Sequence, residues 1–127
     1  MTKIKVGDSF RTINEASEYA FGFKTPRVGF KPAADFHVKG DYWAWFARNT
    51  KGWNDISSET EIKVSHVKLT EEKCRERERL HKSRKFVTFI YDHIEKHYKF
   101  AGVFEFVCRK GDEFLYERTA TEYRSSP

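Results

Sequence analysis

Apolar residues first recur at helical spacing close to the N-terminus. Positions i, i+3, i+7 and i+8 of this segment form one stripe, made of Ile13, Ala16, Ala20 and Phe21. The segment Thr12-Ile13-Asn14-Glu15 has the form of a capping box, in which the Thr12 hydroxyl accepts from the Glu15 amide. Gly22 is placed to end the helix in a left-handed conformation. The pattern predicts a helix over residues 13–21 whose apolar stripe faces a core.

A second helix is predicted over residues 70–82, where charged residues dominate. Thr70 can cap its N-terminus, and the helix macrodipole favours the acidic side chains of the first turn. Glu71 stands four residues before Arg75, so opposite charges meet on the helix surface. The apolar contacts come from Cys74 and Leu80 alone. The helix therefore presents a polar surface on which a protein partner could dock.

Aromatic and β-branched runs predict strands in the rest of the chain. The clearest runs cover residues 86–91, 97–108 and 113–119. The short polar turns between them favour three antiparallel strands. Further strands are expected at 28–31, 36–38, 42–46 and 61–67, with a turn at 49–52. Gly102 interrupts the middle aromatic run and marks a bulge or the close approach of another backbone.

These elements predict one α+β domain that spans residues 1–127. The chain has 127 residues, close to the commonest size of a single domain. Aromatic residues make up 17% of the chain, and rings favour sheet surfaces over helix bundles. We expect a strongly curved, mostly antiparallel sheet or a small β-barrel, with both helices packed on its outside.

The net charge and the cysteine spacing indicate what kind of partner the chain binds and in which cellular compartment it works. The formal net charge is +5, which suits attraction to a polyanion. Cys74 and Cys108 have no paired spacing, so we expect free thiols in a reducing compartment. The first residues do not form a signal peptide, and no apolar run reaches transmembrane length. We expect a cytoplasmic protein with no membrane partner.

The three tryptophans lie in and just after the first aromatic strand. Trp43 and Trp45 project from one side of that strand, while the alternate residues, which are also apolar, project from the other. The turn that follows predicts a hairpin leading to Trp53. Pairing of Trp53 with Ala47 would place the three rings on one side, whereas pairing with Arg48 would place Trp53 on the opposite side.

The two registers lead to different roles for these rings. The first builds an aromatic wall suited to stacking a base or enclosing a methylated group. In the alternative interpretation the rings fill the core, as most aromatic side chains do. We expect Trp45, central in its strand, to be a core residue, and Trp53, beside a glycine turn, to be the exposed ring.

Basic residues recur beside aromatic ones, as expected where phosphates are neutralised and bases are stacked. The candidate phosphate contacts are Lys82, Arg84, Lys85 and Lys99. Solvated loop ends explain each basic cluster separately as well. The candidate binding residues are thus Trp43, Trp45, Trp53, Lys82, Arg84, Lys85 and Lys99.

The sequence offers no recognisable catalytic or metal-binding constellation. His93 and His97 stand four apart, but this spacing spans a predicted turn rather than one helix face. There is no phosphate-binding glycine loop, no nucleophile elbow and no carboxylate cluster of familiar spacing. We therefore expect no enzymatic activity, no catalytic residue, no metal and no cofactor.

Three segments resemble a known family of small aromatic-rich β-barrels. They are residues 42–46, 99–106 and 115–123. These segments are similar to the PUA-like base-reader domains, the group that includes EVE, YTH and SRA domains, some of which are appended to bacterial restriction nucleases. The resemblance implies recognition of a modified or flipped base in an aromatic pocket beside a basic groove.

Two functions agree with these sequence features. The first is a small nucleic-acid-binding module of bacterial or phage origin, with DNA or RNA as its partner. The alternative is a protein-interaction or inhibitor domain, such as a stand-alone phage or bacterial factor that binds a protein partner.

Overall fold

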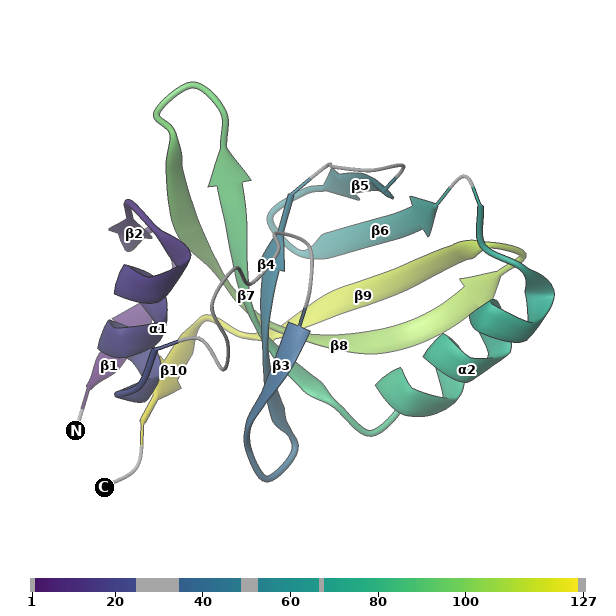
Figure 1. The fold of residues 1–127 in the computed structure, drawn as a ribbon, viewed down its shortest axis with the longest axis horizontal. Helices are drawn as coiled ribbons and strands as arrows, with labels where there is room; N and C mark the ends of the chain where they lie inside the picture. The colour runs from purple at the N-terminus through teal and green to yellow at the C-terminus, as the bar shows by residue number, and fades with distance from the viewer. Residues whose placement is uncertain (1, 25–34, 49–52, 67, 126–127) are drawn as a thin grey trace.

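A computed structural model describes residues 2–24, 35–48, 53–66 and 68–125. The helices in these ranges are α1 (Ile13–Phe21) and α2 (Glu71–His81) (Figure 1). The strands are β1 (Lys3–Lys5), β2 (Ser9–Phe10), β3 (Asp35–Lys39), β4 (Tyr42–Ala47), β5 (Trp53–Ser57), β6 (Glu61–His66), β7 (Lys85–Asp92), β8 (His97–Lys110), β9 (Glu113–Ala120) and β10 (Glu122–Arg124). The predicted strand at 28–31 and turn at 49–52 lie outside the described residues.

Eight strands form one mixed sheet. Its order is β3-β4-β7-β8-β9-β6-β5, and β2 pairs with β8, while β1 and β10 form a separate two-stranded ribbon. β4 and β7 are parallel, and the other described pairs are antiparallel. The predicted α+β class and mostly antiparallel pairing are therefore confirmed. The described strands do not form the expected closed barrel, because β3 and β5 are open ends of the strand order, and the expected strong curl is not found.

The predicted hairpin between β4 and the segment at Trp53 is wrong. β4 pairs with β3 and β7, whereas β5 pairs with β6 and places Trp53 opposite His66. Neither register considered for Trp53 therefore occurs. β4 is instead an inner strand between β3 and β7, the position typical of a strand that is apolar on both faces. Its hairpin partner is β3, joined through Gly40, whose φ of 56° suits a tight turn.

Both helices begin and end close to the predicted residues. In α1 the Thr12 hydroxyl accepts from the Glu15 amide at 3.0 Å, and Gly22 has a left-handed φ of 81°. In α2 the Thr70 hydroxyl accepts from the Lys73 amide at 3.2 Å. Local capping chemistry thus decides both N-termini.

Two cores lie on opposite faces of β4 and β7. On one face Phe46 and Phe89 stack with ring centroids 4.7 Å apart, and Ala16 and Ala20 of α1 belong to the same cluster. The second core comprises Trp45, Phe86, Phe104, Phe114 and Tyr116, joined by Cys74 of α2. The helices accordingly lie at opposite ends of the molecule, α1 beside β1 and β10 and α2 beside β8 and β9 (Figure 1). Both apolar faces of β4 are therefore buried.

Gly102 fulfils both parts of its prediction. The β7–β8 register shifts beside it, since Thr88 lies opposite Gly102 but Phe89 lies opposite Phe100. Its φ is 122°, and an added Cβ would lie 2.7 Å from the Ala120 carbonyl oxygen. The long strand β8 can therefore bend here because no side chain is present.

Replacing Gly102 by Ala is expected to destabilise the domain by about 1–3 kcal/mol, because the new Cβ meets backbone in a strained conformation. Gly111→Ala is the control, since Gly111 also has a positive φ of 63° but no atom within 4 Å of an added Cβ. It should cost about 1 kcal/mol. Urea unfolding of both variants measures the difference, and equal stabilities would contradict the role assigned to Gly102.

Candidate nucleic-acid interface

A cluster of ionisable side chains, two of them buried and four partly buried, lies beside α2 and the sheet. We call it the buried polar cluster, and it consists of Asp35, Asp55, Arg77, His81, Arg84 and Tyr116. His81 Nδ1 lies 2.7 Å from the Tyr116 hydroxyl, and His81 Nε2 lies 3.7 Å from Asp35 Oδ2. Arg84 reaches the same Asp35 oxygen at 3.4 Å. The cluster thus connects β3, β5, α2, the turn before β7 and β9, and Tyr116 joins it to the second core.

Burial keeps the imidazole and the phenol of this cluster neutral. Desolvation, together with the charges of Arg77 and Arg84, lowers the pKa of His81 to about 2. Burial also raises the pKa of Tyr116 to about 12. The contact between His81 and Asp35 is therefore not an ion pair. The neutral imidazole shares a hydrogen bond with the Tyr116 hydroxyl through Nδ1, and its tautomer decides which group donates.

The pKa values of two carboxyl groups in the cluster are raised, so burial favours their neutral forms as well. Burial raises the pKa of Asp55 to about 6, although the charge of Arg77 opposes the shift. Burial likewise raises the pKa of Asp35, opposed by Arg84 and Arg77. Strongly shifted groups concentrate at functional sites more than elsewhere. The buried polar cluster is therefore the strongest candidate site among the described residues.

Trp45 and Trp43 lie at different depths beside this cluster. Trp45 is 5% exposed, and its ring centroid is 5.1 Å from that of Tyr116, so Trp45 belongs to the core. Trp43 is partly exposed, with the Arg84 guanidinium 3.5 Å from its ring centroid and the His37 ring 5.3 Å away. The side chain of Trp53 lies outside the described residues. Trp43 is thus the described tryptophan that solvent can reach.

Three of the four candidate phosphate contacts come together where α2 leads into β7. Lys82 follows α2, Arg84 stacks on Trp43, and the Lys85 amide donates to the Asp41 carbonyl at 2.8 Å. Lys39 lies opposite Tyr42 in β3, beside the same turn, and adds a further cation. We call Lys39, Lys82, Arg84 and Lys85 the basic corner.

Lys99 does not join the basic corner. It lies opposite Ile90, five residues along β7 from Lys85, which corresponds to about 17 Å. Its ammonium contacts Asp92 at 3.2 Å and Glu95 at 3.0 Å. Lys82, by comparison, has an exposed and loose contact with Glu78 at 3.9 Å. A phosphate would therefore have to compete with two carboxylates for Lys99.

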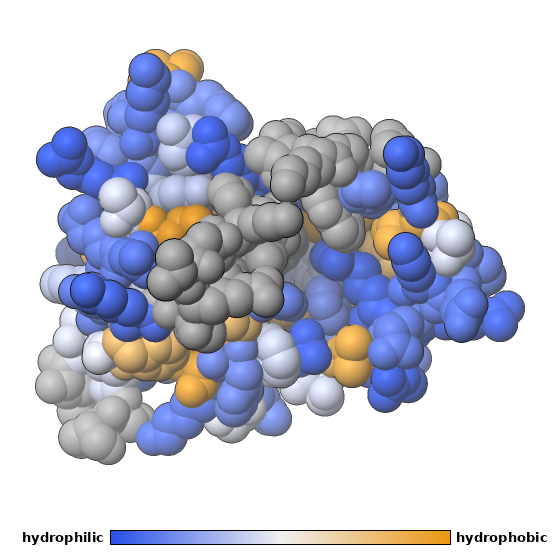
Figure 2. Space-filling model, in the orientation of Figure 1, coloured by the Kyte–Doolittle hydropathy of each residue, from blue (hydrophilic) through white to orange (hydrophobic). Residues whose placement is uncertain are grey.

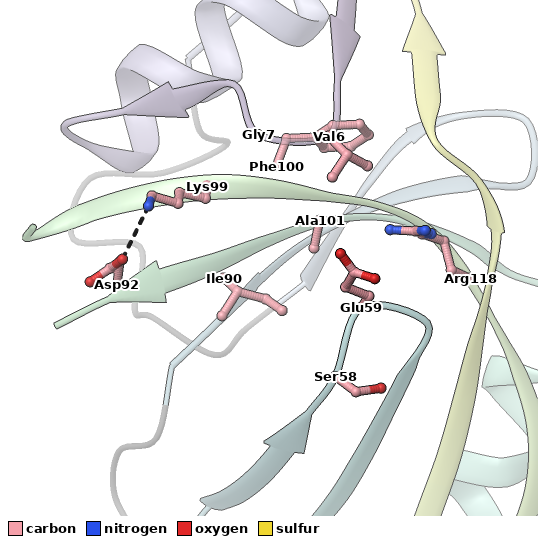
Figure 3. A pocket seen from close by; sticks show the side chains of 10 residues that line it. All are labelled: Val6, Gly7, Ser58, Glu59, Ile90, Asp92, Lys99, Phe100, Ala101 and Arg118. Atoms are coloured by element: carbon pink, nitrogen blue, oxygen red, sulfur yellow. Dashed lines mark ion pairs between the residues drawn. The ribbon is translucent and has the colours of Figure 1, made fainter. Parts of the chain in front are cut away.

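Two cavities are both lined by Ile90, which lies near the turn end of β7. The larger, of about 320 Å³, lies between the β1–β2 and β5–β6 turns, with Lys99 and Asp92 on one side and Arg118 and Glu59 on another (Figure 3). The smaller, of about 90 Å³, is lined by Ala47, Arg48, Asp55, Ser57, Ile62 and Ile90. Asp55 therefore links the buried polar cluster to an opening at the surface.

Sequence reasoning missed the buried polar cluster apart from Arg84. Asp55, Arg77 and His81 stand singly in elements that otherwise look solvent-exposed, and they form no motif. Asp55 lies opposite the buried Val64, and directly opposed residues of an antiparallel pair share a face. Knowledge of the β5–β6 register would have placed Asp55 on the core side.

The described residues contain no group of three or more His, Cys, Asp and Glu arranged to hold a metal ion. His93 and His97 flank the tip of the β7–β8 hairpin. Neither described helix has the length and apolar character needed to cross a membrane. The candidate site itself is made of carboxylates, guanidinium groups and aromatic rings.

Comparison with known proteins gives a structural match and no sequence match. No family model and no curated protein matches the chain. Its fold is similar to that of the 5-hydroxymethylcytosine-specific restriction enzyme AbaSI, with a TM-score of 0.72 and 18% sequence identity. The match covers 98% of this chain and 44% of that chain, so it spans less than half of the enzyme. The chain thus has the fold of one part of a restriction enzyme.

The raised pKa of Asp55 predicts how stability changes with pH. Folding disfavours the ionised carboxylate, so the stability contributed by the protonated group is present below its unfolded pKa of 3.8 and is lost as pH rises through about 6. Asp55→Asn, which cannot ionise, should be more stable than the parent by about 1–3 kcal/mol at about pH 7.5. The advantage should largely disappear at about pH 4.

Urea unfolding at the two pH values measures this difference. Asp112→Asn, at the exposed β8–β9 turn, is the control and should show no comparable change. An Asp55→Asn variant whose stability follows that of the parent at both pH values would show that burial does not shift this carboxyl group.

Proposed function

We propose that this domain binds nucleic acid and recognises a modified base at the buried polar cluster. The observation that carries the proposal is the fold shared over 98% of the chain with part of AbaSI, an enzyme specific for 5-hydroxymethylcytosine. Fold alone does not define function, so the proposal also needs suitable chemistry in this chain. That chemistry is a carboxylate at the small cavity, an accessible tryptophan and a nearby group of cations.

Asp55 is the proposed contact to the base. A carboxylate accepts a hydrogen bond from the exocyclic amine of cytosine, a group that thymine lacks. Asp55 lines the small cavity together with Arg48 and Ser57, which supply donors for the remaining polar atoms of a base. The base would leave the stack to reach such a cavity, as it does in other proteins that act on a single base.

Trp43 and Trp53 are the proposed stacking groups, and the basic corner is the proposed phosphate contact. Trp43 is partly exposed and borders Arg84, so one side chain pair joins the aromatic and basic parts of the site. Trp53 stays a prediction from the sequence. Trp45, which is 5% exposed, supports the site from the core.

The alternative of a protein partner at α2 has weaker support. Arg109 of β8 contacts Glu71 at 3.1 Å and Glu78 at 3.1 Å, so two acidic side chains of the helix are already engaged. Arg75 and Arg79 also contact acidic residues of the same helix. The charges that would attract a partner are therefore largely neutralised within the domain.

Fluorescence anisotropy with labelled duplexes tests the proposal. Three duplexes differ at one position, which carries cytosine, 5-methylcytosine or 5-hydroxymethylcytosine. We expect one modified duplex to bind most tightly, and affinity for all three to fall as salt rises. Lys85→Ala should weaken binding to all three and reduce the salt slope by about 1, unlike Lys110→Ala at the β8–β9 turn. Equal affinity for the three duplexes would exclude base recognition, and salt-independent affinity would exclude phosphate binding.

Two tryptophan substitutions separate a ligand contact from a core residue. Trp43→Ala should weaken binding to the preferred duplex by about 1–3 kcal/mol and leave most of the stability intact. Trp45→Ala should instead lower the free energy of unfolding by about 3–5 kcal/mol. Thermal melting and anisotropy on the same variants measure both quantities. A Trp43→Ala variant that binds like the parent, or that melts as low as Trp45→Ala, would contradict the stacking role.

A further inference from the structure

An arginine that the proposed base site does not use points into the larger of the two cavities. Arg118 of β9 is half-buried, and its guanidinium lies at one side of this cavity of about 320 Å³ (Figure 3). Arg109 of the neighbouring strand contacts Glu71 and Glu78 at 3.1 Å each. Arg118 forms no ion pair and no side-chain hydrogen bond with the residues that the structure describes. A half-buried cation without an anion loses hydration without compensation, so an anionic ligand is favoured here.

The position of Arg118 depends on Gly102. An added Cβ at Gly102 would lie 2.5 Å from Cδ and 2.9 Å from Cγ of Arg118, so the methylene groups of the arginine occupy the space that a side chain would need. Arg118 lies opposite Phe104, two residues from the glycine. This packing holds the stem of Arg118 against β8. The guanidinium is therefore placed at the cavity before any ligand arrives.

The walls of the cavity are formed by two turns that are hydrogen-bonded in place. On one side the Gly7 amide of the β1–β2 turn donates to the Phe100 carbonyl at 3.1 Å. On the other side the Ser58 hydroxyl accepts from the Glu61 amide at 3.2 Å and closes the β5–β6 turn. Small-molecule sites are usually preformed and have volumes of about 300–1,000 Å³. The cavity agrees with both properties.

The floor of the cavity is apolar, and one end of it is charged. Most of the molecular face shown in Figure 2 is hydrophilic, whereas Val6, Ile90 and Ala101 give the cavity apolar surface suited to a flat ring. The ion pair between Asp92 and Lys99, at 3.2 Å, lies at one end. It offers both an acceptor and a donor to the edge of a base.

The other end of the cavity carries Arg118 and Glu59 (Figure 3). A guanidinium binds a phosphate through two parallel N–H donors. A carboxylate accepts hydrogen bonds from sugar hydroxyls, and the Glu59 side chain is exposed on the β5–β6 turn. A ligand made of a phosphate, a sugar and a base would therefore meet suitable chemistry along the whole cavity.

We propose that this cavity binds a nucleoside 5′-monophosphate, with the phosphate at Arg118, the sugar at Glu59 and the base on the apolar floor. The proposal is independent of the function proposed above, because Asp55 lines the smaller cavity and not this one. Ile90 lines both cavities, so a nucleotide in the larger one lies next to the base site.

Isothermal titration calorimetry with cytidine 5′-monophosphate and with cytidine tests this site. The nucleotide should bind about tenfold more tightly than the nucleoside, because only the nucleotide has a phosphate for Arg118. Arg118→Met keeps the stem beside Gly102 and removes the guanidinium, so it should lose this tenfold gain and bind cytidine like the parent. Arg124→Met, on the exposed part of β10, is the control and should match the parent. Val6→Trp leaves Arg118 in place but fills the cavity, so it should abolish binding of both ligands.

The source of the nucleotide is tested with a single strand that ends in cytidine, with and without a 5′-phosphate. A tenfold gain from the phosphate that Arg118→Met removes would assign the site to a strand end. Binding of the free nucleotide without such a gain would assign the site to a free nucleotide.

Asp55→Asn separates the nucleotide site from the base site and should bind cytidine 5′-monophosphate like the parent. Loss of binding in Asp55→Asn, with parental binding in Arg118→Met, would place the nucleotide in the smaller cavity and overturn this proposal. A folded parent that binds neither the nucleotide nor the phosphorylated strand end would also overturn it. These outcomes do not involve the modified duplexes, so the two proposals fail separately.

Discussion

The domain depends on one strand that is apolar on both faces. β4 alternates residues such as Phe46 on one side with Trp45 on the other, and both are almost completely buried. A strand of this kind needs neighbours at both edges and a layer over each face, which β3, β7 and the two cores provide. The resulting second core covers polar side chains of α2, β3 and β9. The candidate site is thus a product of how β4 is buried.

Burial of polar groups costs free energy, and at this site the same burial shifts the pKa values of the buried groups. Outside water, His81 stays neutral, Tyr116 keeps its proton and Asp55 becomes a weak acid with a pKa of about 6. The charge of Arg77 opposes the effect of burial on Asp55 and Tyr116, whereas at His81 it adds to that effect. Such a network is fixed in geometry and sensitive to any polar ligand that enters the small cavity. A base with a distinctive hydrogen-bonding edge is a ligand of that type.

Local chemistry explains what could be predicted from the sequence. Capping residues such as Thr12 and aromatic runs gave α1, α2 and the strands β7–β9, and an isolated glycine gave the bulge at Gly102. Pairing between distant segments has no signature in the local sequence. The prediction that β4 pairs with the segment at Trp53 was therefore wrong, since β4 pairs with β7 and β5 pairs with β6. Asp55 and His81 were missed for the same reason, because their burial depends on long-range register. Arg84 and Trp43 stay predictions as binding residues, although the structure brings their side chains together.

The parallel pairing of β4 with β7 also governs how the chain can fold. Tyr42 lies opposite Lys85, so β5, β6 and α2 must all be synthesised before β4 gains its second neighbour. Pairing across such a span is slow, because the intervening loop must close first. During that interval a flat, aromatic strand edge is open to other chains. The same two-faced strand that stabilises the finished domain therefore makes its partly synthesised form prone to aggregation.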